Sequence, residues 1–373
     1  MKKLLIKQFY AALILTFVSG AAHAFPDMIR HGYTNCTACH VSPSGGGVLN
    51  AYGRSLSKEL ISTWSGKNEE GLLHFINTEK VDDWLAIGGD FRGAQVHQEN
   101  ETVKRGKWIS MQAGVEVALT PSIFTFDIFA GQFRPSASGT EFKEYAPRYY
   151  AMVKPRDELY IKLGRFLPNF GLNSPDHIIA TRGPLMMGYG MERDTAEVSW
   201  LGEDWNIIGG YYQTPKNISA DSQTGITGTV TYTFLGNFKT GLQFLSEKDD
   251  VQTRKITGAL GYLGWTKDIG TLFEIDSVTV SQVTQQVAGG PERKGVALLH
   301  RSSFEVFKGF HVVVLNSYLQ SDVDAGSTKT YRFGPGIQWF PRPHFDVQAF
   351  WTREQASSLK EGDYAWLVLH YYL

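Results

Sequence analysis

The chain has 373 residues, and its 36 Lys and Arg nearly balance 37 Asp and Glu, which gives a formal net charge of −1. Such a balance supplies no basic surface, so the composition argues against a nucleic-acid partner. The 39 Gly and the 13% of aromatic residues, with only 42% hydrophobic residues, are unusual for a soluble domain. They are typical of a transmembrane β-barrel, in which only alternate residues meet lipid.

The first 24 residues have the three parts of a secretory signal peptide. A basic start is followed by an apolar run over 9–18 and by the small-residue end Ala22-His23-Ala24, and we expect cleavage before Phe25. The basic residues are Lys2, Lys3 and Lys7. The apolar run is too short to cross a membrane as a helix, and no later stretch of 18 apolar residues predicts one. Export from a Gram-negative cell is therefore expected.

The chain's only two cysteines stand in the sequence Cys36-Thr37-Ala38-Cys39-His40, which resembles the haem-attachment motif of c-type cytochromes. The resemblance covers five residues, so it implies chemistry and not a fold. It implies thioether bonds from Cys36 and Cys39 to one covalent haem c, with His40 as the proximal ligand of the iron. A Cys36–Cys39 disulfide and a zinc site that includes His31 and His40 are the alternatives.

The sixth position of the iron has several candidates. We prefer His31, because it lies on the haem segment itself, and His74 and Met28 are the alternatives within the same domain. Two further alternatives are that the sixth position is open or that a residue from the rest of the chain occupies it.

Residues 25–82 are expected to form this small haem domain, which is partly helical. Gly45-Gly46-Gly47 predicts a permissive loop, and apolar residues at three- and four-residue spacing over 48–64 predict a helix. One face of that helix is expected to cover the haem edge, and it would present Leu49, Tyr52, Leu56, Leu60 and Trp64. The segment is too small to enclose a haem by itself, so we expect the haem to lean on the remainder of the chain or on a partner.

From Asp83 to Leu373 the chain repeats segments of about ten residues in which polar and apolar side chains alternate, each followed by a turn. A period of two indicates β-strands. The repeats predict an all-β fold, an antiparallel transmembrane barrel of sixteen strands, an even number as in bacterial single-chain barrels. The predicted strands are 84–97, 107–120, 123–133, 143–154, 158–166, 194–201, 204–213, 226–235, 238–247, 253–265, 269–282, 294–307, 309–320, 329–340, 344–355 and 364–373. In 294–307 the register stays open, because either His300 or Arg301 must face the wrong way.

Connections between these strands alternate between short and long, as in outer-membrane barrels with short periplasmic turns and longer external loops. The short set is Pro121-Ser122, Pro155-Arg156-Asp157, Gly202-Glu203, Gly236-Asn237, Lys267-Asp268, Lys308 and Pro341-Arg342-Pro343. Aromatic residues beside these turns predict an interfacial girdle formed by Trp205, Trp265, Trp339 and Phe340. A soluble β-sandwich is the alternative fold.

The C-terminal alternation of Ala365, Leu367, Leu369, Tyr371 and Leu373 resembles the terminal strand of outer-membrane porins. The resemblance implies insertion by the barrel-assembly machinery, an outer-membrane location and possible assembly as a homo-trimer. The usual final Phe is replaced by Leu373.

Charged side chains of both signs are predicted to face the barrel interior, which sixteen strands make wide enough for a water-filled channel. They are Asp90, Arg92, Glu116, Asp127, Arg148, Lys154, Lys162, Glu197, Glu274, Asp276, Arg332, Asp346 and Arg353. The longest loop, about 167–193, is expected either to fold inward as a constriction or to cap the surface. Its Asp176-His177 pair is the only hint of catalytic chemistry outside the haem motif, so we do not expect an enzyme.

These observations favour electron transfer between periplasmic cytochromes or other redox proteins and the outer membrane or the cell exterior. The alternative is a diffusion porin whose N-terminal haem is a plug, a sensor or a docking element. An even strand count with a periplasmic C-terminus puts the haem domain on the periplasmic side.

Overall fold

The structure is a computed structural model, and it describes residues 27–67, 69, 84–133, 143–144, 148–172, 179–187, 192–215, 223–282, 292–325, 329–357 and 359–373. The predicted signal peptide, His74 and the Asp176-His177 pair lie outside these residues. Within the described part of the chain, no helix is both long and apolar enough to cross a membrane.

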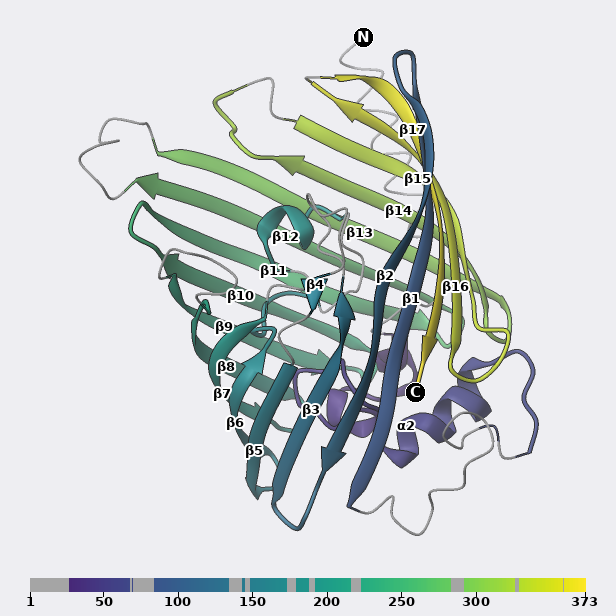
Figure 1. Ribbon diagram of the computed structural model, residues 1–373, viewed down its shortest axis with the longest axis vertical. Coiled ribbons are helices and arrows are strands. Elements are labelled where there is room, and N and C mark those ends of the chain that lie inside the picture. Colours follow the sequence, from purple (N-terminus) through teal and green to yellow (C-terminus); the bar gives the residue numbers. More distant parts are fainter. Residues whose placement is uncertain are drawn as a thin grey trace.

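Sixteen long antiparallel strands and one two-residue strand, β4, form a closed barrel in the described residues (Figure 1). Each long strand pairs with the next one along the chain, and β17 pairs with β1 to close the sheet. The strands are β1 Leu85–Asn100, β2 Lys104–Leu119, β3 Phe124–Phe133, β4 Lys143–Glu144, β5 Arg148–Arg156, β6 Leu159–Phe166, β7 Arg193–Leu201, β8 Trp205–Gln213, β9 Thr224–Phe234, β10 Phe238–Lys248, β11 Gln252–Thr266, β12 Ile269–Gln282, β13 Arg293–Phe307, β14 Phe310–Gln320, β15 Lys329–Trp339, β16 Phe345–Ala356 and β17 Leu359–Tyr372. The predicted strand 143–154 is divided into β4 and β5, and each of the other predictions overlaps one observed strand. The predicted barrel and its even number of long strands are confirmed.

Alternate side chains of each strand face opposite sides of the wall. In β7, Glu197 and Ser199 are buried inside the barrel, whereas Val198 and Trp200 are exposed on the outside. The outer surface carries the apolar side chains, as expected of a barrel whose outside contacts lipid.

The structure settles the open register in β13. Arg301 faces the interior, where it is 6% exposed. His300 lies on the other side of the strand, where its Nδ1 is 2.9 Å from Asn316 Nδ2 and its Nε2 is 3.0 Å from Ser302 Oγ. The polar side chains of Asn316 and Ser302 therefore satisfy an imidazole on the outer face.

One of the predicted inward charges is wrong. Arg353 lies an odd number of residues from Asp346, so in an extended strand the two side chains take opposite faces. Arg353 is exposed on the side of Trp351, and it pairs with Asp363 (3.0 Å) and Glu361 (3.3 Å).

The aromatic girdle is confirmed at Trp205 and Trp265, whereas Trp339 is partly covered by the N-terminal segment, where its Nε1 donates to Thr63 Oγ1 (3.1 Å). Trp205 and Trp265 are exposed beside short turns. Phe340 follows Trp339 in extended backbone and points to the opposite side, where it is 1% exposed and meets the His311 ring edge-on. Phe340 is therefore a buried residue and not part of the girdle.

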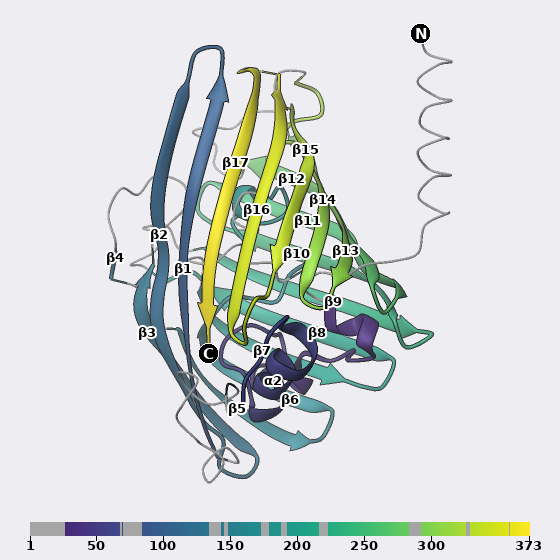
Figure 2. The same ribbon diagram turned by 90° about the vertical axis from the view of Figure 1, so that its right-hand side faces the viewer.

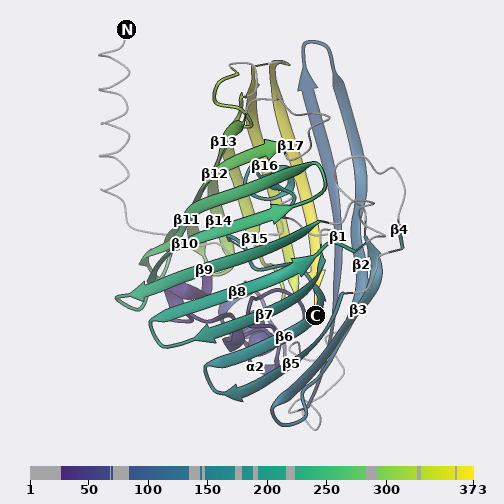
Figure 3. The ribbon, with the colours of Figure 1, turned by 90° about the vertical axis from the view of Figure 1, so that its left-hand side faces the viewer.

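The N-terminal segment, residues 27–67, lies against the barrel at the end that carries the short turns. In Figure 2 the segment, in purple, lies in front of β6–β9. Figure 3 views the barrel from the opposite side, and there the segment lies behind the same strands. It therefore sits on the inner side of these strands. Its elements are η1 Asp27–His31, η2 Cys36–Ala38, α2 Ala51–Leu56 and the π-helical turn η3 Ser57–Ile61.

Hydrogen bonds fix this segment to the short turns. Thr63 donates from N to Phe340 O (2.8 Å) and from Oγ1 to Lys308 O (2.8 Å), and Asn35 Nδ2 donates to Gly202 O (3.2 Å). Arg30 adds an ion pair with Glu305 (3.2 Å). Because these contacts reach turns far apart around the rim, the segment spans the mouth of the barrel.

The described parts of the longest loop, about 167–193, fold into the barrel, which agrees with the predicted constriction and not with a cap on the surface. Its described parts, 167–172 and 179–187, include the 3₁₀ turn η4 Gly183–Leu185. Apolar side chains of the loop pack against inward-facing residues of the wall, and the cluster comprises Phe170, Ala180, Leu185, Met187, Leu245, Ile256 and Ala297. The N-terminal segment thus occupies the mouth of the barrel, and the loop occupies part of its interior.

Candidate functional site

The two cysteines lie on one side of a single 3₁₀ turn, η2. A 3₁₀ helix has three residues per turn, so side chains three apart are eclipsed. Cys39 closes the turn by donating its N–H to Cys36 O (3.1 Å), and His40 N donates to the same oxygen (2.9 Å). The spacing of the motif thus presents both thiols in one direction, with His40 directly after them.

Asn50 fastens this turn to the following helix. Its Oδ1 caps α2 by accepting from Gly53 N (2.8 Å), and its Nδ2 donates to the carbonyl oxygens of Thr37 and Ala38 (both 3.2 Å). The helix runs over 51–61, shorter than the predicted 48–64, because Leu49 forms a β-bridge with His40 and Ser62 is extended. Leu56 and Ile61 face the cavity between this segment and the barrel wall, whereas Tyr52 and Trp64 of the predicted face are exposed.

Gly53 is required where α2 crosses the cysteine turn, because a Cβ there would overlap the Cys39 carbonyl group. We expect Gly53→Ala to destabilise the packing of α2 on the turn by about 1–3 kcal/mol, the usual cost of overpacking. Limited proteolysis of the segment and denaturant unfolding measure this. Ser55→Ala on the same helix is the control, and equal behaviour of the two variants would contradict the close contact.

A cavity of about 330 Å³ separates the segment from the barrel wall, within the size range of ligand pockets. Cys36, Cys39 and His40 line it on the segment side. Its lining is mainly apolar, and both parts of the chain supply this surface through Met28, Ile29, Leu49, Leu56, Leu172, Ile208, Leu260 and Tyr262. Both the N-terminal segment and the barrel wall therefore line the space beside Cys36, Cys39 and His40.

Both thiols are free, with no bond between them. Cys36 is exposed on the side of the cavity, and desolvation by the surrounding protein raises the pKa of its thiol. Burial likewise raises the pKa of Cys39 to about 11. Within the described ranges, no three His, Cys, Asp or Glu side chains converge as a metal site requires, so the zinc alternative gains no support there.

His40 lies deep in the fold, and burial lowers its pKa below the ordinary value. The ring is therefore neutral at neutral pH, which is the form that binds iron. Its Nδ1 is buried and makes no hydrogen bond with the described residues. Two thiols and a neutral imidazole beside an apolar cavity fit a covalently attached haem.

The candidates for the sixth ligand are placed differently. Met28 lines the cavity. His31 is not among the residues that line it, and its Nε2 accepts a hydrogen bond from Arg30 Nε (3.0 Å). Burial and the neighbouring Arg30 lower the pKa of His31 to about 4. The structure brings Met28, and not His31, to the cavity.

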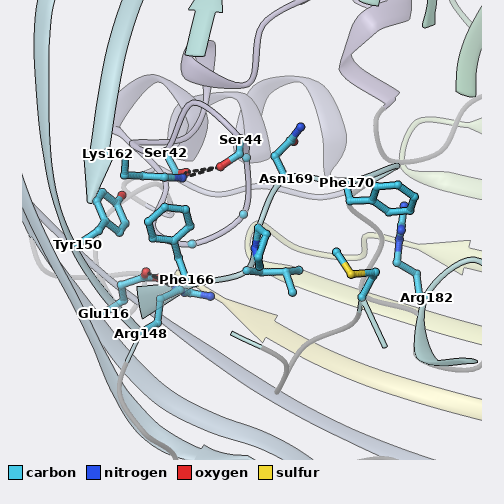
Figure 4. Close-up of a pocket in the computed structure, with 16 residues that line it drawn as sticks. Ser42, Ser44, Glu116, Arg148, Tyr150, Lys162, Phe166, Asn169, Phe170 and Arg182 are labelled. Carbon is cyan, nitrogen blue, oxygen red and sulfur yellow. Dashed lines mark hydrogen bonds and ion pairs between the residues drawn. The ribbon is translucent and has the colours of Figure 1, made fainter. Parts of the chain in front are cut away.

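A smaller pocket of about 50 Å³ adjoins the glycine loop Gly45–Gly47 (Figure 4). Lys162 of β6 lies beside it, and its Nζ donates to Ser44 Oγ (2.7 Å) and Ser42 Oγ (3.3 Å) while pairing with Glu197 (3.0 Å). A buried cation of the wall thereby holds the glycine loop inside the barrel.

Solved structures resemble the whole barrel. OmpT of Vibrio cholerae matches with a TM-score of 0.60 at 11% identity, over 78% of this chain and 97% of that one. OprB of Pseudomonas putida gives 0.61 at 11%, over 84% and 99%, and an anion-selective porin from Comamonas acidovorans gives 0.58 at 10%, over 78% and 99%. The fold is that of an outer-membrane porin. Neither the family models nor the curated protein sequences gave a match.

The porin fold brings residues to the cavity that the sequence did not suggest for the site. They are Arg301, Gln338, Gln348, His370, Tyr372 and Lys239. The signal that could have found Arg301 is the choice of register in β13, where an arginine facing inward and a histidine facing outward is the only arrangement that keeps the guanidinium off the lipid face.

Proposed function

We propose that this protein is an outer-membrane β-barrel that carries one covalent haem c and takes part in electron transfer between periplasmic redox proteins, such as cytochromes, and the outer membrane or the exterior. Cys36 and Cys39 would hold the haem through thioether bonds, and His40 would bind its iron. A bound haem supplies one-electron chemistry through its iron. The barrel itself is assigned no catalytic reaction.

The observation that carries this proposal is the joint cavity. The haem-attachment motif alone is five residues long, but here its two thiols and its histidine face a mainly apolar space that the segment and the barrel wall enclose together. The wall residues would orient the haem, and the mainly apolar lining would exclude water from it, which are the contributions that a protein makes to a redox cofactor.

The position of the short turns supports a periplasmic location for the proposed haem. In bacterial outer-membrane barrels the short turns face the periplasm, and the segment is hydrogen-bonded to Gly202, Lys308 and Pro341 in those turns. The proposed haem would therefore lie at the periplasmic mouth, where soluble donors reach it without crossing lipid. A single haem does not bridge a hydrocarbon layer of about 25 Å, so a further carrier is implied.

The attachment is tested by intact mass. Protein matured in a Gram-negative host should exceed the mass of the processed polypeptide by one haem, and acid-acetone should fail to extract it. Cys36→Ser with Cys39→Ser should lose the covalent haem while the protein still migrates differently in detergent gels with and without boiling. A wild-type mass without haem would overturn the proposal.

A porin plugged by its own N-terminal segment is the second candidate. The observation that favours it is the filled mouth: the segment reaches several turns and is tied to the wall through Lys162. The matching structures include porins, and one OmpT structure is described as a trimer form. We therefore also propose the homo-trimer as an assembly to be tested.

A further inference from the structure

The cavity has different chemistry at its two ends. At one end, Cys36 lies beside the wall formed by β7–β10, where Asn35 contacts Gly202 and Lys239 Nζ donates to Thr34 O (2.5 Å). At the other end the wall is formed by β1, β13, β15, β16 and β17. Polar side chains line that second end: Arg92, Arg301, Gln338 and Asp346 are buried, and His370 is partly buried.

The order of pairing shows that part of the second end, at β17 and β1, lies across the barrel from β9 and β10, whereas β13 is only three strands along the sheet from β10. β17 is eight long strands along the sheet from β9, which is half of the circumference in either direction. Figure 3 shows β6–β9 and the pair β1 and β17 on different sides of the barrel. Apolar residues such as Leu260 and Tyr262 lie between the two ends.

A covalent haem likewise has two chemically different edges. The vinyl-derived carbons that bond to cysteine occupy one side of the macrocycle, the ring is apolar, and two propionate carboxylates occupy the other side. We propose that Arg92 of β1 and Arg301 of β13 receive these two carboxylates, so that the barrel wall holds the edge of the haem opposite Cys36 and Cys39. The inference rests on the proposed covalent haem and adds to it the groups that position its free edge.

The surroundings of the two arginines suit this role. Arg301 donates to the neutral amide of Gln338 (2.6 Å to Oε1) and lies over the Phe350 ring. Arg92 lies 3.8 Å from Asp90, but the same carboxylate is also 3.1 Å from His370 Nε2. Arginine donates to carboxylates from a rigid planar group with several N–H bonds, and such charge-assisted bonds are strong when buried. Both guanidinium groups are nearly buried and both line the cavity.

The test is the midpoint potential of the full-length haem protein in detergent, measured for Arg92→Gln, Arg301→Gln and the double variant. Removing a cation leaves carboxylate charge uncompensated near the iron and favours the ferric state, so each variant should lower the potential and the double variant should lower it most. Arg332→Gln is the control, because Arg332 is a luminal arginine that pairs with Glu354 and does not line the cavity. Its potential should equal that of the wild type.

Intact mass is measured on every variant. Potentials of Arg92→Gln and Arg301→Gln that equal the control, with haem attached, would overturn the assignment of the two arginines and leave the haem in place. A wild type without haem would instead overturn the proposed function. If the double variant does not mature, Arg92→Lys with Arg301→Lys keeps both charges and should retain nearly the wild-type potential, while the single Gln variants supply the downward shift.

Discussion

A variant that lacks residues 27–67 should conduct ions in a planar bilayer, whereas the full-length protein should conduct little. The reason is geometric: sixteen-stranded porins leave an aqueous channel, and here the N-terminal segment spans its mouth and is bonded to the turns through Thr63 and Asn35. We expect conductance to rise roughly tenfold or more, since the remaining inward loop narrows such a channel without spanning its mouth.

Two controls separate the plug from the haem and from the folding of the barrel. Full-length Cys36→Ser with Cys39→Ser keeps the segment but loses the attachment thiols, so it should stay closed while electron exchange with a reduced periplasmic cytochrome is lost. Migration that changes on boiling should show that the shortened barrel still assembles. Equal conductance of the full-length and shortened proteins would show that the segment is no plug.

The barrel could be predicted from the sequence because a wall between lipid and lumen imposes one strong pattern, the alternation of apolar and polar side chains. That pattern located all sixteen long strands, although it placed Arg353 inside and Phe340 in the girdle. Both errors come from parity: a side chain one residue off the alternation changes face, and near a strand end the polar or aromatic character of a residue does not reveal its side.

The motif from Cys36 to His40, on which the proposed haem depends, was equally visible, because its residues are adjacent in sequence. The polar end of the cavity, by contrast, could not be predicted from the sequence. Arg92, Arg301 and His370 come from three strands. Closure of the sheet pairs β17 with β1, which brings Arg92 and His370 together at 3.3 Å, and all three residues line the cavity that the N-terminal segment completes. Nothing local to these residues signals either event. The choice between His31 and Met28 as the sixth ligand stays a prediction, because nearness along the chain does not decide which side of η1 faces the wall.

Glu274→Gln should release the inward loop. Glu274 is fully buried, and its carboxylate accepts from Arg182 Nη2 at 2.8 and 3.1 Å, from Gln243 Nε2 at 2.9 Å and from Leu172 N at 3.3 Å. The substitution removes the negative charge but leaves the Arg182 guanidinium buried. Breaking a buried pair from one side costs about 3–5 kcal/mol, and we expect the lower end because Asp276 also lies near Arg182.

The loop can leave the wall without unfolding the sheet, so this cost should appear as local opening. We expect much faster proteolysis within 167–172 and 179–187, and a further rise in conductance when the substitution is combined with removal of 27–67. Asp194→Asn is the matched control, because Asp194 pairs with Arg165 at 2.8 Å but is half exposed, and such surface pairs contribute about 1 kcal/mol or less. Equal proteolysis of the two variants would mean that Arg182 and Glu274 do not hold the loop, and that its apolar contacts with Leu245 and Ile256 suffice.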